Sequence, residues 1–183
     1  MVVGKHRAAD GIQRAADGLK AQKEHSPGHR PGYVVVCGLR SERAKDCLYC
    51  QNNQTQKDLM IEIAHLRVSR AFLFKEQTYH GRCLVAYDHH ANDLNELTDE
   101  ERNAFMADVA QVTRAMQKLF NPVKINYGAY SDKLSHLHFH LAPKYVDGPD
   151  YGGTFQMNPG KVYLSDAEYA EMVSALRAAL TQA

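Results

Sequence analysis

The chain has 183 residues, enough for one domain with a sizeable core that needs no disulfide bonds to support it. Its 22 lysines and arginines balance 21 acidic residues, which excludes the overall positive charge on which non-specific nucleic-acid binding depends. No apolar run approaches the length of a membrane span, and the N-terminus lacks the apolar stretch of a secretory signal. We therefore expect a cytoplasmic protein, with neither a nucleic-acid polymer nor a membrane as its partner.

The N-terminal part of the chain differs from the rest. Residues 7–13 are nearly repeated as residues 14–20, a seven-residue period that places their apolar side chains on one stripe of a helix. A glycine in each copy makes that helix marginal, since each glycine costs about 1 kcal/mol against alanine. We expect residues 1–32 to be an N-terminal extension, either mobile or docked as a helix, and residues 33–183 to form a single domain.

Short apolar runs predict strands in the following segment. Cys47 and Cys50 stand in polar sequence as a Cys-x-x-Cys knuckle, followed by a predicted loop through residue 58. In a reducing compartment such a close pair indicates metal binding or redox chemistry rather than a disulfide framework. Short connections between the runs favour an antiparallel meander. The predicted strands are 33–37, 60–68, 71–75 and 82–87, in which Cys37 and Cys83 are expected to be small core residues.

The clearest helix of the sequence begins after Thr98. Thr98 and Glu101 match a capping box, and apolar residues then recur every three or four positions until a proline ends the pattern. Residues 123–128 alternate as a further strand, with Asn126 and Gly128 on its polar side. We expect the apolar face of the helix to cover a sheet, and its residues are Phe105, Val109, Val112, Met116 and Leu119.

The C-terminal part combines a long loop and a second helix. Residues 147–160 predict a loop that is either a lid or specificity element or an ordinary surface excursion. Ser165 and Glu168 form a second capping box. The helix after it has an apolar face of Tyr169, Met172, Val173, Leu176 and Leu180. About five antiparallel strands with two main helices segregated from them define the α+β class.

Three histidines with alternate spacing, His136, His138 and His140, stand in a predicted strand. In a strand the three imidazoles share one face, and the intervening apolar side chains share the other. Neighbouring rings would lie about 7 Å apart, close enough to engage adjacent phosphates of one ligand. Such a row can also be a pH switch, a metal site or a plain imidazole ladder, although three polar rings on one face need partners.

These histidines carry a resemblance to the histidine triad (HIT) superfamily. Residues 136–142 match its signature of three histidines separated by single apolar residues and followed by two more apolar residues. The Cys-x-x-Cys knuckle, residues 84–90 and Asn126-x-Gly128 occur in the family's order. The resemblance covers residues 47–144. It implies a homodimeric nucleotidyl hydrolase or transferase, built on an antiparallel sheet, that acts on phosphoramidates, dinucleoside polyphosphates or related nucleotide esters.

The resemblance also implies a role for individual residues. His138 would attack the α-phosphorus and form a nucleotidyl-imidazole intermediate. His140 would contact the phosphate or protonate the leaving group, a task suited to a pKa near neutrality. Asn126 would donate a hydrogen bond to phosphate or ribose, and Lys133, if it points inward, would place a positive charge against the leaving group.

The chain departs from the family pattern just before the triad. Many members carry a Gly-Gln pair there, whereas this chain reads Ser131-Asp132-Lys133-Leu134-Ser135. Ser131 and Ser135 are the hydroxyl candidates for the missing contact to the substrate. The alternative is that both serines only cap a turn.

Members that keep the paired cysteines resemble the zinc-containing uridylyltransferase branch of the family. Cys47, Cys50, His90 and His136 would supply the Cys2His2 donor set that tetrahedral zinc prefers. His90 rather than His89 falls on the matching position after the preceding strand. Such a zinc ion would be structural and would not activate water. The alternative is that the cysteines are unpaired core thiols and His90 only supports its neighbours.

Two rival hypotheses remain from the sequence. One makes His136, His138 and His140 a catalytic metal centre. It requires a sharp bend, because alternate strand residues lie too far apart to share one ion at bond lengths of about 2 Å. The other is a zinc-stabilised nucleotide-binding module that uses the triad only to grip phosphate.

Overall fold

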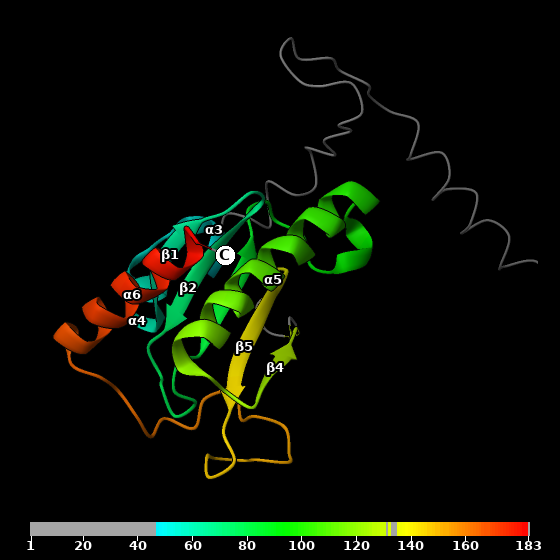
Figure 1. Ribbon diagram of the computed structural model, residues 1–183. Helices are drawn as coiled ribbons and strands as arrows, with labels where there is room; N and C mark the ends of the chain where they lie inside the picture. The colour runs from blue at the N-terminus through cyan, green and yellow to red at the C-terminus, as the bar shows by residue number, and fades with distance from the viewer. Residues whose placement is uncertain (1–46, 131, 133–134, 183) are drawn as a thin grey trace, which may run out of the picture. The chain divides into compact units, whose positions relative to one another are not determined.

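The computed structural model describes residues 47–130, 132 and 135–182. In this part of the chain, five strands form one antiparallel sheet in the order β1-β2-β3-β5-β4 (Figure 1). The strands are β1 (Met60–His65), β2 (Ser69–Phe74), β3 (Cys83–Tyr87), β4 (Lys124–Gly128) and β5 (His138–Lys144). The predicted α+β fold is confirmed. The predicted extension 1–32 and strand 33–37, with Cys37, lie outside the described residues.

Two long helices, α5 (Asp99–Phe120) and α6 (Asp166–Leu180), cover one face of this sheet (Figure 1). Both begin with the predicted capping boxes, in which the side chains of Thr98 and Ser165 accept from the amides of Glu101 and Glu168. Their buried residues pack against the alternate strand residues that point to the same face. This core contains Val85 and Leu141 from the sheet with Phe105, Val109, Val112, Met116, Val173 and Leu176 from the helices.

Some predicted boundaries and faces are wrong. Leu119 is 37% exposed, because it lies in the last turn of α5, after the core residues that end at Met116. Strand β1 ends at His65 rather than at Val68, because the amide of Leu66 donates to the Ser69 carbonyl at 2.7 Å and closes the turn into β2.

The predicted loop after the cysteine knuckle is also wrong, because two short helices occupy it. They are α3 (Leu48–Gln51) and α4 (Gln54–Leu59). Asn53 caps α4 by accepting a hydrogen bond from the Gln56 amide at 3.1 Å, which satisfies an amide of its first turn. Most of the polar residues that suggested a loop therefore form the exposed face of a capped helical turn, whereas Gln56 of α4 is buried. A 3-10 turn, η2 (Leu94–Glu96), precedes α5.

The second face of the sheet carries the histidines. Strand β5 lies between β3 and β4, so His140 pairs with Leu84 on one side and with Gly128 on the other, and His138 pairs with Ala86. Directly paired residues of an antiparallel ladder share a face. Leu84 and Ala86 pack with Leu48 and Tyr49 of α3 rather than with α5, so α3 covers part of the histidine face.

Among the helices of the described residues, none combines the length and apolar character needed to span a membrane.

Candidate functional site

The three histidines do not form the uniform row that a single strand predicts. His136 stands at a bend before β5, and only His138 and His140 lie within the strand. His136 has no exposed surface, and its Nε2 donates to the Tyr87 carbonyl at 2.8 Å. This contact leaves the Nδ1 lone pair of His136 on the side of the cysteines.

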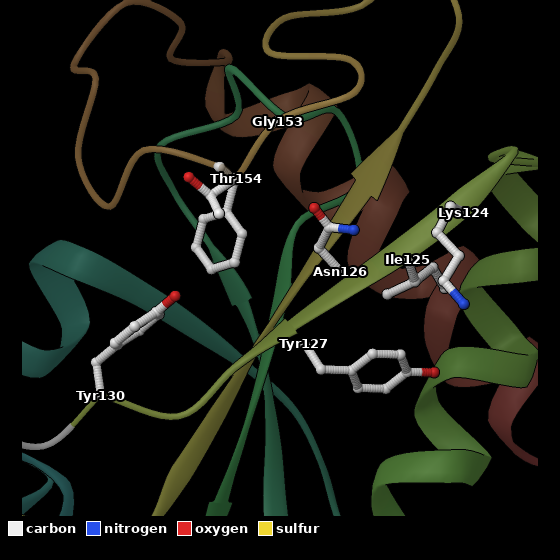
Figure 2. A pocket seen from close by; sticks show the side chains of 8 residues that line it. Lys124, Ile125, Asn126, Tyr127, Tyr130, Gly153 and Thr154 are labelled. Atoms are coloured by element: carbon white, nitrogen blue, oxygen red, sulfur yellow. The ribbon is translucent and has the colours of Figure 1, made fainter.

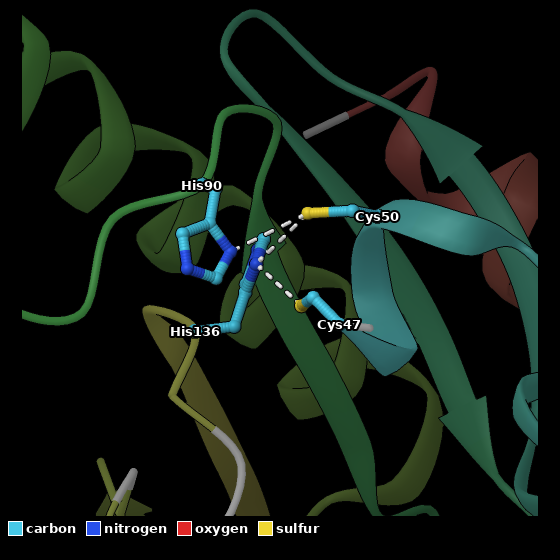
Figure 3. A group of neighbouring side chains, drawn as sticks. All are labelled: Cys47, Cys50, His90 and His136. Atoms are coloured by element: carbon cyan, nitrogen blue, oxygen red, sulfur yellow. Dashed lines mark hydrogen bonds between the residues drawn. The ribbon is translucent and has the colours of Figure 1, made fainter. Parts of the chain in front are cut away.

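Four side chains from three separate segments meet around His136. Cys47 caps α3 and Cys50 lies within it, His90 follows β3, and His136 precedes β5 (Figure 3). The Nδ1 atom of His136 lies 3.4 Å from Sγ of Cys47 and 3.6 Å from Sγ of Cys50. His90 Nδ1 lies 3.6 Å from Sγ of Cys50. All four ligand atoms lie within 4.8 Å of one another, and they are the four residues of the predicted metal site.

These distances fit a zinc ion. In a tetrahedral site with Zn–S bonds of about 2.3 Å and Zn–N bonds of about 2.05 Å, sulfur and nitrogen ligands stand about 3.6 Å apart. The hydrogen bond from His136 to Tyr87 fixes the ring in the tautomer whose Nδ1 can bind metal. Burial, followed by the contact with Cys47, raises the pKa of Cys50 to about 12, and a coordinated dication is what stabilises such a thiolate. The cluster can therefore hold a structural metal ion.

His138 is buried at the start of β5. Its Nδ1 donates to the carbonyl oxygen of His136 at 2.6 Å, so the lone pair of the neutral ring belongs to Nε2. Burial lowers the pKa of His138, which keeps the imidazole neutral at pH 7. The ring of Tyr49 lies 4.7 Å from that of His138, between centroids, and also stacks on His136. The arrangement fixes the tautomer of His138 and leaves its lone pair on Nε2.

His140 has a partner that the sequence did not predict. A guanidinium nitrogen of Arg82, Nη2, donates to His140 Nδ1 at 3.0 Å, and both side chains are buried. Burial, and then the positive charge of Arg82, lower the pKa of His140 to about 2. The only sequence signal for this contact is a charged residue placed directly before the wholly apolar strand β3.

The other described residues that were predicted to bind substrate lie outside β5. Asn126 is half-buried on β4, paired with Ala142, and lines an open groove of about 410 Å³ (Figure 2). Ser135 is exposed and directly precedes His136. Lys133, like Ser131, lies outside the described residues. Other residues that line the groove are Lys124, Tyr127, Tyr130, Thr154 and Phe155.

The long loop predicted at 147–160 forms a wall beside this groove. Lys144, at the end of β5, donates to the carbonyls of Pro149 and Asp150, at 3.2 and 2.5 Å. The hydroxyl of Tyr79 accepts from the Gln156 amide at 2.6 Å. These buried anchors hold Phe155 with its ring 6.3 Å from the ring of His140, between centroids. The loop thus contributes directly to the histidine face.

Two aromatic side chains approach the backbone of residue 128 so closely that only glycine fits there. A Cβ atom at this position would lie 2.4 Å from Tyr130 and 2.8 Å from Phe155. The glycine therefore lets the two aromatic rings close over β4, next to its paired residue His140.

An antiparallel sheet that carries His138 and His140 on a central strand, with His136 just before it, is the arrangement of a histidine triad protein. Sequence comparison gives the family. The model of the HIT domain matches residues 54–147, and the chain belongs to this family. A stretch of 100 residues is 30% identical to the adenosine 5'-monophosphoramidase of Schizosaccharomyces pombe and covers 54% of this chain and 74% of the relative. A 120-residue stretch is 25% identical to Protein hit of Bacillus subtilis, covering 62% and 81% of the two chains.

Solved structures share the fold. A histidine triad protein from Bradyrhizobium japonicum superposes with a TM-score of 0.64 at 19% identity, over 70% of this chain and 96% of its own. A Zn-bound histidine triad family protein from Mycobacterium smegmatis gives a TM-score of 0.53 at 20% identity, over 76% and 96%. The chain therefore has the fold of this family along most of the neighbours' length.

Proposed function

We propose that this chain is a nucleotidyl hydrolase or transferase that cleaves a phosphoanhydride or phosphoramidate bond through a nucleotidyl-His138 intermediate. The observation that carries the proposal is the hydrogen bond from His138 Nδ1 to the His136 carbonyl. It directs the lone pair to Nε2, as nucleophilic attack on phosphorus requires. It also stabilises the imidazole when it becomes positively charged by bonding to phosphorus.

The reaction proceeds in two displacements. His138 Nε2 forms a bond to the α-phosphorus while the bond from phosphorus to the leaving oxygen or nitrogen breaks, and the leaving group takes up a proton. Water or an acceptor hydroxyl then attacks the same phosphorus, loses its proton, and returns the electron pair to Nε2. His140 and Asn126 bind the phosphate or ribose during both steps, and Ser135 and Lys133 are proposed contacts on the leaving-group side.

We further propose a nucleoside phosphoramidate, such as adenosine phosphoramidate, or a dinucleoside polyphosphate as the substrate. The Schizosaccharomyces pombe relative, an adenosine 5'-monophosphoramidase, supports the first of these. The open groove beside Asn126, with Tyr130 and Phe155 at its wall, offers aromatic surface to a second nucleoside or another leaving group.

Zinc has a structural role in this proposal. Cys47, Cys50, His90 and His136 would hold the ion with a complete set of four protein ligands, so it would have no open position for water. The ion would crosslink α3 to the imidazole of His136, and it would thereby hold in place the His136 carbonyl that orients His138. We also propose a cytoplasmic location, because the reducing conditions there would keep both cysteines available as metal ligands.

The structure gives the three-histidine metal centre no support. His136 turns its Nδ1 toward the cysteines, and Nδ1 of His138 and of His140 face a carbonyl oxygen and a guanidinium. Within the described ranges, 47–130, 132 and 135–182, the only cluster of potential metal ligands is the Cys2His2 group. A guanidinium that donates to an imidazole nitrogen would repel a cation at that atom.

We also propose that two copies pair through β4. This strand is an edge of the described sheet, with β5 on one side. Tyr127, within β4, and Val123, directly before β4, are large apolar residues that are 49% and 60% exposed. An exposed, apolar edge strand is a template for pairing with a second strand.

His138→Ala tests the proposal. We expect turnover of adenosine phosphoramidate to be abolished, while the circular dichroism spectrum and the zinc content stay at wild-type values. Joint loss of metal and activity would instead support the catalytic-metal hypothesis. His65→Ala, which changes an exposed histidine at the end of β1, is the matched control.

A further inference from the structure

Arg82 places a guanidinium inside the histidine face of the sheet. Its side chain has no exposed surface, and Nη1 donates to the Met157 carbonyl at 2.6 Å. Nη2 lies 3.0 Å from His140 Nδ1 and 3.2 Å from the Met157 sulfur. The guanidinium carbon stands 4.4 Å from the centre of the Phe74 ring. A cation in so dry a place needs acceptors and a counter-charge that offset its desolvation, and His140 Nδ1 is one of these acceptors.

The contact with Arg82 decides the tautomer of His140. A guanidinium has five N–H donors and no acceptor, so it can only donate to the imidazole. Nδ1 of His140 must therefore carry the lone pair, and Nε2 must carry the hydrogen. A second proton on Nδ1 would face the donor directly, which agrees with the lowering of the His140 pKa to about 2 by burial and by Arg82.

Arg82 itself remains a cation. Burial lowers its pKa to about 10, and the negative charge of Glu76 opposes that shift. Glu76 Oε2 lies 3.9 Å from Nη1 of Arg82, and its side chain is 4% exposed. At pH 7 the guanidinium thus stays protonated and keeps donating to His140.

We propose that Arg82 is a positioning residue that holds His140 as the neutral Nε2–H tautomer, so that His140 donates a hydrogen bond to the substrate phosphate and does not protonate the leaving group. The proposal rests on the proposed attack by His138. It selects one of the two roles that the family resemblance leaves to His140. The leaving group then takes its proton from solvent.

The two histidines of β5 are held in opposite tautomers. His138 keeps its hydrogen on Nδ1 through the His136 carbonyl, whereas His140 keeps its hydrogen on Nε2 through Arg82. Their ring centroids lie 5.0 Å apart with an interplanar angle of 74°. One ring therefore offers a lone pair and its neighbour a donor. The lone pair of His138 suits attack on phosphorus. The N–H of His140 suits a phosphoryl oxygen that gains negative charge in the transition state.

Arg82 also connects His140 to the loop beside the groove. The Met157 carbonyl and sulfur both contact the guanidinium. Glu76, its counter-charge, accepts from the amides of Lys161 and Val162 at 3.3 and 3.5 Å. The ion pair thereby anchors the segment that directly follows Phe155, at Met157 and at Lys161 and Val162.

Nitrogen NMR of the imidazoles in the full-length, zinc-loaded protein at pH 7 tests the proposal. ¹⁵N shifts distinguish a protonated from an unprotonated ring nitrogen, and the signals that disappear in His140→Asn assign His140. We expect a protonated Nε2 and an unprotonated Nδ1. A wild-type His140 that carries its hydrogen on Nδ1, or on both nitrogens, would overturn the proposal.

Two variants of Arg82 complete the test. Arg82→Met removes the donor, so we expect mixed tautomers of His140 and a kcat lower by about ten- to a hundredfold, with a smaller change in KM. The loss is smaller than the roughly 10²–10³ in kcat for complete removal of one transition-state donor, because part of His140 keeps the hydrogen on Nε2. Arg82→Lys, which can only donate, is expected to restore the tautomer and part of the rate. Unchanged tautomer and kcat in Arg82→Met would refute the role. If Arg82→Met does not fold, the wild-type and Arg82→Lys spectra still decide.

The NMR result does not depend on turnover. If His138→Ala retains activity while His140 shows the expected tautomer, the proposed mechanism fails and the positioning by Arg82 stands. If a nucleotidyl group is found bound covalently to His138 but His140 is protonated on Nδ1, the mechanism stands and the positioning fails.

Discussion

The carbonyl oxygen of His136 accepts a hydrogen bond from Nδ1 of His138 at 2.6 Å, while the imidazole of His136 faces the cysteines of α3. His136 thus belongs to the Cys2His2 group through its side chain and contacts the proposed nucleophile through its backbone. A metal ion in the cluster would hold the position of this carbonyl. The proposed metal site and the proposed nucleophile are therefore linked through His136.

We predict about one zinc ion per chain in the purified full-length protein, as expected for a closed four-ligand site. Cys50→Ser should lower the zinc content strongly, because it removes a thiolate that lies near both histidines. Cys83→Ala is the matched control, since Cys83 is a buried cysteine of the core and no part of the cluster. Elemental analysis checks both variants. Metal-free wild-type protein with two titratable thiols at Cys47 and Cys50 would contradict the zinc site.

We predict that stability falls below about pH 6.5, partly because of His140. Its pKa is about 2 in the folded protein and returns to the ordinary value of 6.5 on unfolding. Between these values the unfolded chain binds one more proton, so stability is full above pH 6.5 and decreases as the pH falls. This one group contributes at most about 1.4 kcal/mol per pH unit.

His140→Asn removes this proton uptake. Its free energy of unfolding, measured in urea, should decrease less steeply than that of wild type between about pH 6.5 and pH 5. His80→Asn, which changes an exposed histidine outside the site, is the comparison variant. Equal slopes for His140→Asn and wild type would show that His140 is not held neutral.

We predict a homodimer that depends on β4. Tyr127→Glu places a charge on the edge strand and should shift the mass measured by light scattering from two chains to one. Tyr151→Glu is a matched control, because Tyr151 is also 49% exposed but lies in the long loop. A monomeric wild-type protein, or a Tyr127→Glu variant that remains dimeric, argues against this interface.

Local signals in the sequence were sufficient to predict most of the fold. The capping boxes at Thr98 and Ser165 depend on residues three positions apart, and the structure contains both. The buried Cys83 and the strand at Asn126 follow from apolar runs and alternation. The helix α4 was missed because its cap is one hydrogen bond, from the Gln56 amide to Asn53, in a polar segment that resembles a loop.

Within the candidate site, only the residues that belong to the family's sequence motifs could be predicted. The four potential metal ligands were expected, and the structure brings them together from three segments. The contact between Arg82 and His140 joins residues 58 positions apart, and no local pattern encodes it. The bend at His136 is likewise set by tertiary partners, the Tyr87 carbonyl and the cysteines, which override the alternation of the strand.

The most direct test of the central claim is to trap the covalent intermediate. The full-length protein is mixed with adenosine phosphoramidate labelled in its nucleotide part, quenched rapidly, and mapped by mass spectrometry. We expect one nucleotidyl group on His138, present in His65→Ala and absent in His138→Ala. Turnover without an adduct, or an adduct on another residue, would contradict His138 as the nucleophile, and reversible binding without turnover would establish a nucleotide-binding module instead.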